Sequence, residues 1–113
     1  MSTEPGTAFH YQIEETRDEE NFKTTTIKCQ GRLVSENTDE IRKLVQPMIQ
    51  RGGCRIVLDF TDLEYLDSSG LGAIVGLKVS QLNRGLCHLD LVNLTPRVKE
   101  LLRITNLMQL FSS

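Results

Sequence analysis

The segment Asp67-Ser68-Ser69-Gly70 offers the clearest chemistry in this sequence, because it places two hydroxyl groups directly after a carboxylate. It follows a short apolar run at residues 54–60 and precedes a glycine-spaced apolar run over residues 71–76. This pattern predicts a turn at the carboxyl end of a buried strand, where functional sites gather in α/β sheets. The first N–H groups of the following helix lack partners within the helix, so any of these three polar side chains is a candidate cap.

Two hypotheses explain the serines. As a helix cap, a serine stabilises a helix by about 1 kcal/mol. As a phosphate acceptor, Ser68 would carry about −1.5 to −2 charges, which a helix N-terminus favours by about 0.3–1 kcal/mol. Repulsion from Asp67 is of similar size in a solvated site, so phosphorylation should leave the fold intact and act on a docked partner. An unpaired buried charge costs such a complex about 3–5 kcal/mol, on the order of a hundred- to a thousandfold in affinity.

Hydrolase and nucleotide-binding sites fit the same segment poorly. A nucleophile elbow needs G-x-S-x-G, but Leu66-Asp67 and Gly70-Leu71 flank the serines. A serine nucleophile also needs a base, and nothing in the pattern aims His10 or His88 at Ser68. The stretch SSGLGAIVGLKVS lacks the P-loop spacing G-x-x-x-x-G-K-[ST]. An enzyme that uses Ser68 as its nucleophile is therefore the least favoured hypothesis, and we predict no catalytic residue.

Gly72 and Gly76 are four residues apart and share one face of the predicted helix. A glycine inside a helix weakens it by up to about 1 kcal/mol relative to alanine, so each glycine needs a reason. One explanation is close packing of the helix on its own sheet. The other is close approach by the backbone of a partner, and the sequence does not decide between them.

The composition describes one globular domain. A chain of 113 residues is long enough for a single modest core, and 39% apolar and 25% charged residues are near the globular averages. The net charge of −2 predicts no broad attraction to nucleic acid or anionic lipid. The apolar runs are far shorter than the roughly 20 residues that span a bilayer, and MSTEPGTA has no signal-peptide pattern.

The three cysteines and two histidines are interpreted as ordinary strand or core residues. Cys29, Cys54 and Cys87 are odd in number and lie far apart, so we predict neither a disulfide framework nor a metal site. Free thiols are typical of the reducing cytoplasm, where we expect this protein. We also predict no cofactor.

Hydrophobic periodicity predicts the elements that position the Asp67 turn. Residues 1–8 are expected to form a flexible tail and residues 9–113 one domain. Strands are predicted around residues 9–13, 22–29, 54–60, 87–94 and 108–111. Helices are predicted through Ile41–Met48, from about Ser69 to Asn83, and from Pro96. The resulting order, β-β-α-β-α-β-α-β, favours an α/β fold in which parallel crossovers follow an antiparallel hairpin.

Four local predictions are specific. Pro47 removes one helical hydrogen bond, so we expect a kink or an early end of the first helix there. The run CRIVLDF, residues 54–60, is apolar enough for a strand buried on both faces. The alternation over residues 9–13 predicts a half-buried strand. Thr95-Pro96 is typical of a cap followed by a first-turn proline.

The segments IVLDFTDLEYLDSSGLGAIVGL and LVNLTPRVKELLRITNLMQLF resemble STAS domains, in particular the bacterial anti-sigma factor antagonists. The likeness covers roughly residues 9–111, and its most specific part is D-S-S-G-L-G after a buried strand. The resemblance implies a small mixed sheet with helices mainly on one face.

The resemblance also implies a non-enzymatic binding module that switches partners. The unphosphorylated protein would bind an anti-sigma factor that is also a serine kinase, and so release a sigma factor. The kinase, using its own ATP, would phosphorylate Ser68, with Ser69 as second choice, and a serine phosphatase would restore the active form. The residues that match the family's contact region are Asp67, Ser68, Ser69, Gly70, Leu71, Gly72, Val75 and Gly76. We expect a monomer or weak dimer without nucleic-acid or membrane partners.

This sequence departs from the family pattern at two places. Sporulation-type members often carry an acidic residue near the phosphoacceptor, in a G-x-L-D stretch where this chain has Val34. The sequence ends at Ser113, whereas many relatives continue with another helix. An alternative function within the same fold is a STAS subunit of an ABC-type lipid-transport complex, which predicts association with a transporter ATPase and no phosphorylation.

Overall fold

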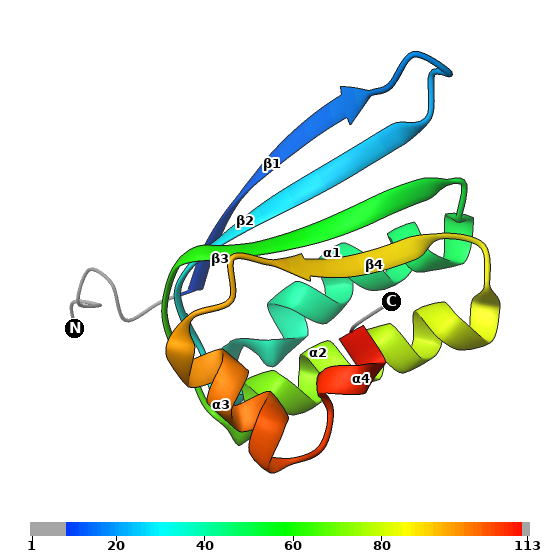
Figure 1. Ribbon diagram of the computed structural model, residues 1–113. Coiled ribbons are helices and arrows are strands. Elements are labelled where there is room, and N and C mark those ends of the chain that lie inside the picture. Colours follow the sequence, from blue (N-terminus) through cyan, green and yellow to red (C-terminus); the bar gives the residue numbers. More distant parts are fainter. Residues whose placement is uncertain (1–8, 112–113) are drawn as a thin grey trace.

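The computed structural model describes residues 9–111, so the tail predicted at residues 1–8 lies outside the described residues. Four strands form one sheet in the order β1-β2-β3-β4, with β1 antiparallel to β2 and the other neighbours parallel. The helices lie on one face of this sheet (Figure 1), which confirms the predicted α/β fold. The elements are β1 (Phe9–Arg17), β2 (Lys23–Leu33), a 3-10 helix (Ser35–Asn37), α1 (Thr38–Arg51), β3 (Cys54–Leu66), α2 (Ser68–Arg84), β4 (His88–Val92), α3 (Pro96–Ile104) and α4 (Met108–Phe111).

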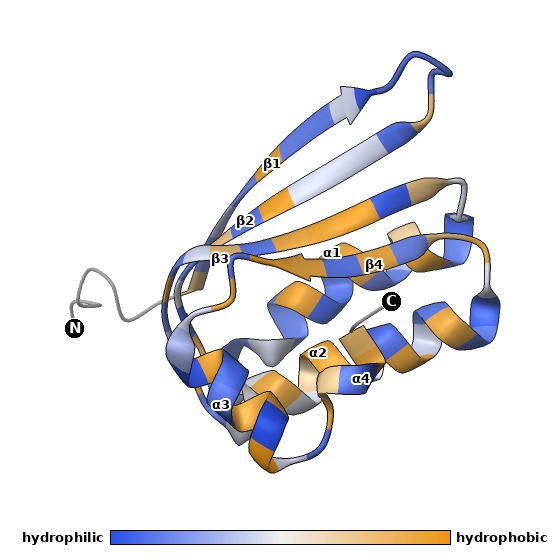
Figure 2. Cartoon of the chain, in the orientation of Figure 1, coloured by the Kyte–Doolittle hydropathy of each residue, from blue (hydrophilic) through white to orange (hydrophobic). Residues whose placement is uncertain are grey.

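The first strand is longer and more exposed than the alternation predicted. Of the nine residues of β1, only Phe9 is buried. Tyr11 and Ile13 face the same side of the sheet as their buried partners on β2, yet 42% and 45% of their surfaces stay exposed. The half-buried prediction is therefore wrong beyond Phe9, because β1 is an edge strand whose far end rises away from the helices (Figure 1). Figure 2 shows how polar most of β1 is.

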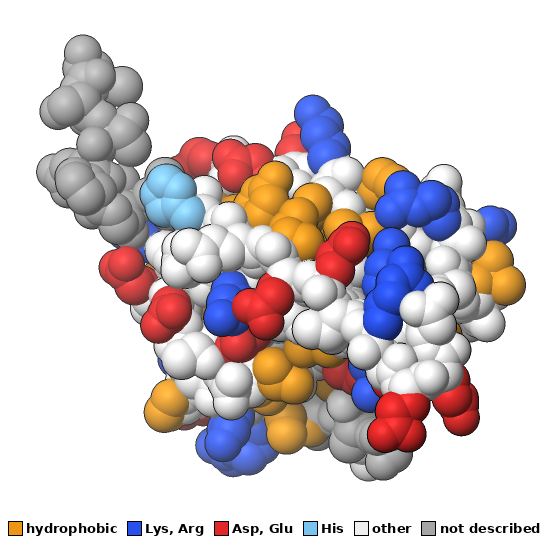
Figure 3. Space-filling model, turned by 90° about the horizontal axis from the view of Figure 1, so that it is seen from above, with side chains coloured by type: hydrophobic (Ala, Val, Ile, Leu, Met, Phe, Trp, Pro, Cys, Tyr) orange, Lys and Arg blue, Asp and Glu red, His pale blue; other side chains and the backbone are white. Residues whose placement is uncertain are grey.

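The strand that leads into the predicted site is buried on one face, not on both. Along β3, Cys54, Ile56, Leu58 and Phe60 are buried, while the residues between them are partly or fully exposed. The cause is that helices cover only one side of the sheet. Figure 3 looks onto the face of the sheet that carries no helices and shows charged side chains of both signs spread over it. The strand also continues to Leu66, through residues expected to form a link.

The first helix runs through Pro47 to Arg51, so the expected early end is wrong. Val45 and Ile49, on either side of the proline in sequence, are completely buried against the sheet. This packing outweighs the one hydrogen bond that the proline removes, which costs a helix interior about 3 kcal/mol. The carbonyl that loses its partner belongs to Lys43, an exposed residue, so water is able to satisfy it.

The last strand predicted from the sequence, residues 108–111, is wrong. This segment forms the short helix α4, held by a hydrogen bond from the Leu110 N–H to the Leu107 carbonyl at 3.1 Å. Leu107 and Phe111 pack against the core. Four residues, three of them apolar, do not distinguish a strand from a helix, and over residues 9–111 no strand beyond β4 extends the sheet.

The core lies between the sheet and helices α1, α2 and α3. Thr95 caps α3 as predicted, since its hydroxyl accepts a hydrogen bond from the Val98 N–H at 3.2 Å. This cap directs Val98 and Leu102 into the core. The largest fully buried side chains are Phe60, Ile27, Leu33, Ile41, Ile49, Ile56, Leu58, Leu66, Ile74, Leu89, Leu102 and Val45.

The three cysteines are buried free thiols. Burial, with a smaller contribution from the charge of Asp59, raises the pKa of Cys29 to about 12. Across residues 9–111, no group of three or more His, Cys, Asp or Glu side chains is arranged to hold a metal ion. Over the same residues, no helix combines the length and apolar character needed to cross a membrane.

Candidate functional site

The predicted site lies where the ends of β2 and β3 meet the first turn of α2. The last residues of the two strands, Leu33 and Leu66, pair in register, and the Asp67 N–H donates to the Leu33 carbonyl at 3.3 Å. Gly70 then passes so close to Leu33 that a Cβ atom there would overlap its carbonyl oxygen. A glycine is therefore required at position 70 for α2 to leave the sheet at this point.

The carboxylate of Asp67, and neither serine, caps α2. Its Oδ1 accepts a hydrogen bond from the Gly70 N–H at 2.8 Å. Ser68 and Ser69 are exposed in the first turn, and within residues 9–111 neither hydroxyl makes a hydrogen bond to another group. Capping therefore does not explain the two serines, whose hydroxyls face solvent and are accessible to another molecule.

The two helix glycines are not explained by packing within the protein. Gly72 and Gly76 are both exposed, and a Cβ atom at either position would meet no atom of residues 9–111 within 4 Å. Of the two explanations open at the sequence level, close packing on the sheet therefore fails. Close approach by another molecule remains.

The exposed side of α2 is apolar. Residues spaced three or four apart from Ser68 share this side, because an α-helix turns once every 3.6 residues. Among them, Val79 and Leu82 are 43% and 52% exposed, and Val75 is half-buried. We call this surface the α2 outer face; its residues are Ser68, Gly72, Val75, Gly76, Val79 and Leu82.

Charge is also missing from this face. Among the 17 residues of α2, only Lys78 and Arg84 are charged. Each is directed to the protein's own backbone: Lys78 donates to the Leu89 carbonyl at 2.8 Å and Arg84 to the Gln50 carbonyl at 2.9 Å. A helix that is apolar on its solvent side as well as on its core side is typical of a contact surface.

The predicted contact residues divide into surface and core. Gly70 and Leu71 are buried, so a docking protein would not reach their side-chain positions. Asp67 is partly buried, and the serines and the two later glycines are exposed. The sequence-based list stopped at Gly76 and so missed Val79 and Leu82, although continuing the same three- and four-residue spacing would have found them.

A hollow of about 410 Å³ opens beside the cap. Its walls are Arg32, Val34, Glu36, Tyr65 and Asp67. Val34, where the sequence resemblance led us to look for an acid, shares this hollow with the carboxylate of Glu36. The Arg32 guanidinium lies 4.7 Å from the centre of the Tyr65 ring. The sequence did not indicate this cluster, because it depends on the register between β2 and β3.

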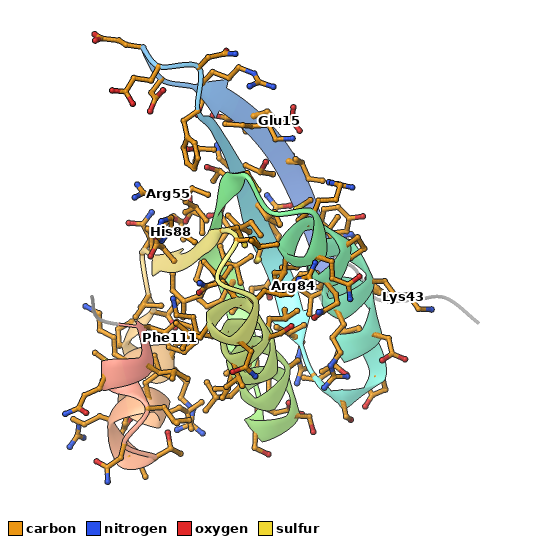
Figure 4. The ribbon with its side chains drawn as sticks, turned by 90° about the vertical axis from the view of Figure 1, so that its right-hand side faces the viewer. Glu15, Lys43, Arg55, Arg84, His88 and Phe111 are labelled. Carbon is orange, nitrogen blue, oxygen red and sulfur yellow. The ribbon has the colours of Figure 1, made fainter. Side chains whose placement is uncertain are left out.

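A larger hollow, of about 650 Å³, lies around the C-terminal half of α2, the start of β4 and α4. Figure 4 labels two of its walls, His88 and Phe111. None of the predicted site residues lines it. His88 pairs with Arg55 near the start of β3, whereas Ser68 follows the end of that strand, so most of the length of β3 separates this histidine from the serine.

Comparisons with known proteins agree on one family. The model of the STAS domain family matches residues 13–112. A protein of Staphylococcus aureus (strain NCTC 8325 / PS 47) named "Anti-sigma-B factor antagonist" is 31% identical over 96 residues, which cover 80% of this chain and 88% of that protein.

Two solved structures show the same fold. The anti-sigma factor antagonist SpoIIAA in its unphosphorylated form has a TM-score of 0.68 and 26% identity, covering 87% of this chain and 82% of that chain. The Bacillus cell fate determinant SpoIIAA in the phosphorylated form has a TM-score of 0.67 and 24% identity, covering 87% and 85%. At 24% identity, the similarity to the phosphorylated form concerns the fold alone.

Proposed function

Because this chain belongs to the STAS domain family, we propose that it is an anti-sigma factor antagonist, a binding module controlled by phosphorylation of Ser68. Its similarity to the Staphylococcus protein, whose name states this role, supports the general assignment. The unphosphorylated form binds an anti-sigma factor through the α2 outer face and thereby releases the sigma factor. The protein itself catalyses no reaction.

One observation carries the proposal. The Ser68 hydroxyl is exposed at the start of a helix that Asp67 already caps, and an apolar, glycine-spaced face runs from it along α2. A hydroxyl with no structural task, placed at one end of a surface without charge, is suited to report its modification to whatever docks there. Ser69 is equally exposed and is the second choice.

The switch follows from desolvation. A phosphate on Ser68 would place about −1.5 to −2 charges at the edge of the α2 outer face. A partner that docks there must bury that charge or hold away from it, and an unpaired buried charge costs about 3–5 kcal/mol. Binding would therefore weaken on the order of a hundred- to a thousandfold.

The remaining components follow from the family resemblance. The anti-sigma factor is also the serine kinase and brings the ATP, and a serine phosphatase removes the phosphate. SpoIIAA, which shares the fold, is known in a phosphorylated and an unphosphorylated form. We place the cycle in the cytoplasm, which agrees with three free cysteines.

The test is to incubate the protein with its cognate anti-sigma factor and ATP and to map the phosphorylated residue by mass spectrometry. We expect phosphate on Ser68. Affinity for the same partner is then measured for Ser68→Ala, which should bind like the wild type, and Ser68→Asp, which should bind more weakly. Ser69→Asp is the matched control, because it puts the same charge on the neighbouring exposed serine.

Two results would contradict the proposal. Phosphate found only outside residues 67–70, or on no residue, would contradict a switch at Ser68. The complete absence of phosphorylation would favour the transport-complex alternative. Wild-type affinity in both Ser68 variants would remove Ser68 from the binding surface.

A further inference from the structure

We propose that Arg32 is the countercharge for a phosphate on Ser68, an ion pair that forms only in the phosphorylated protein. This inference rests on the proposed function in one respect, since it takes Ser68 as the phosphorylated residue. It adds a residue on another element, β2, whose task is to hold the modified side chain in the free protein.

The backbone places Arg32 near Asp67, the residue that precedes Ser68. Arg32 on β2 pairs with Tyr65 on β3 in the parallel register of these strands. Tyr65 comes two residues before Asp67 in the sequence. Asn37 fixes this end of β2, because its Nδ2 donates to the Arg32 carbonyl at 2.8 Å and its Oδ1 accepts from the Val34 N–H at 2.8 Å. Arg32 and Asp67 are walls of the same 410 Å³ hollow, and Ser68 is the next residue of the chain.

The guanidinium is oriented but not neutralised. Its carbon lies 4.7 Å from the centre of the Tyr65 ring, and its Nε is buried without a hydrogen-bond partner among residues 9–111. Two carboxylates, Glu36 and Asp67, line the same hollow, yet within residues 9–111 Arg32 forms no ion pair with either. Stacking on a ring uses the face of a guanidinium and, with Nε buried, leaves the two terminal nitrogens available for a phosphate.

Charge explains why this residue matters. Five side chains of the described residues line the hollow. Arg32 is the one positively charged side chain among them, and Glu36 and Asp67 are negatively charged. A phosphate would add about two further negative charges next to Asp67. An arginine binds phosphate through two parallel N–H···O bonds, which makes it a stronger partner than an isolated helix N-terminus. Arg32 therefore offsets the repulsion from Asp67 and holds the phosphate in the phosphorylated protein.

The experiment installs phosphoserine at position 68 during translation, so that no kinase is needed, and follows the phosphate by ³¹P NMR as a function of pH. A nearby guanidinium favours the dianion, so Arg32→Gln should raise the second pKa of the phosphate. For a partly solvated pair we expect a rise of about half a pH unit. Arg51→Gln is the matched control, since it removes the same charge from an exposed residue at the far end of α1 and should leave the titration unchanged.

A second measurement needs no variant. In uniformly ¹⁵N-labelled protein, the Arg32 Nε–H resonance should move between the serine and phosphoserine forms, whereas that of Arg51 should not. An unchanged phosphate titration in folded Arg32→Gln, or an Arg32 resonance indifferent to phosphoserine, overturns the inference. Neither result concerns the kinase, so failure here and failure of the proposed switch are separate outcomes.

Discussion

Gly70 approaches Leu33 so closely that a Cβ atom at position 70 would overlap the Leu33 carbonyl oxygen. The obstacle is backbone and has no rotamer through which to move aside. Gly70→Ala should therefore destabilise the protein by about 1–3 kcal/mol, the range for overpacked positions. Urea denaturation measures this change. Gly72→Ala, two residues later in open space, is the control, and equal stability of the two variants would contradict the geometry.

Gly72 and Gly76 should separate stability from binding. Alanine at either position meets no neighbouring atom in the described part of the chain, so each substitution should stabilise α2 by about 0.5–1 kcal/mol. The added methyl group would nevertheless hold a closely docked helix or loop away, so affinity for the anti-sigma factor should fall. Calorimetry of unfolding and of binding, performed on the same variants, gives both numbers. A variant that is more stable and binds as tightly as the wild type would show that the partner does not approach this backbone.

The cap of α2 makes a charge-specific prediction. Asp67→Ala removes the acceptor of the Gly70 N–H and should lower the free energy of unfolding by about 1 kcal/mol. Asn is as good a cap as Asp, so Asp67→Asn should retain most of that stability. With phosphoserine at position 68, Asp67→Asn should become more stable than the wild type carrying the same phosphoserine, because the asparagine removes the repulsion. Thermal unfolding of wild type and Asp67→Asn, each with serine and with phosphoserine at position 68, checks this order of stability.

Asp59 predicts a loss of stability in acid. Burial raises the pKa of its carboxyl, but hydrogen bonds from the Thr61 hydroxyl at 2.6 Å, the Thr61 N–H at 2.9 Å and Asn93 at 3.1 Å, with the charge of Lys28, lower it, and the net pKa is below the ordinary value. A folded-state pKa below the unfolded one stabilises the protein above the unfolded pKa of about 3.9. That contribution disappears as pH falls through the folded value.

Asp59→Asn should accordingly be less stable than the wild type at pH 7 and approach it in stability below about pH 4. Urea denaturation at a series of pH values measures the difference. Asp62→Asn is the control, because Asp62 is exposed on the same strand and its side chain makes no hydrogen bond within residues 9–111. A pH-independent difference between wild type and Asp59→Asn would show that the asparagine loses shape complementarity and not a charged hydrogen-bond acceptor.

Much of this architecture was encoded in short-range patterns. The sequence predicted the Asp67 turn, the helix that follows it and the Thr95 cap. It did so because caps, turns and helical spacing involve residues no more than four positions apart. Even so, the same local rules left the capping residue undecided among three side chains. Asp67 takes that role because the approach of β2 aligns its carboxylate with the Gly70 N–H.

Local patterns failed wherever a distant element decided the outcome. Pro47 does not end α1, since Val45 and Ile49 of the helix, one on each side of the proline, are buried against the sheet. β3 is buried on one face only, because the helices cover a single face of the sheet, and residues 108–111 form a helix whose last residue, Phe111, packs against the core. None of these results follows from the residues adjacent in sequence.

The sequence by itself determined the order of the elements through α3 and the position of an exposed pair of hydroxyls at the start of α2. The tertiary structure alone decided that Gly72 and Gly76 face open space, and that Arg32 stands next to that helix start. The physical reason is that periodicity specifies which side of a helix or strand is apolar, whereas strand register and layer order specify what that side meets. Those depend on contacts between residues more than thirty positions apart, such as Arg32 and Tyr65.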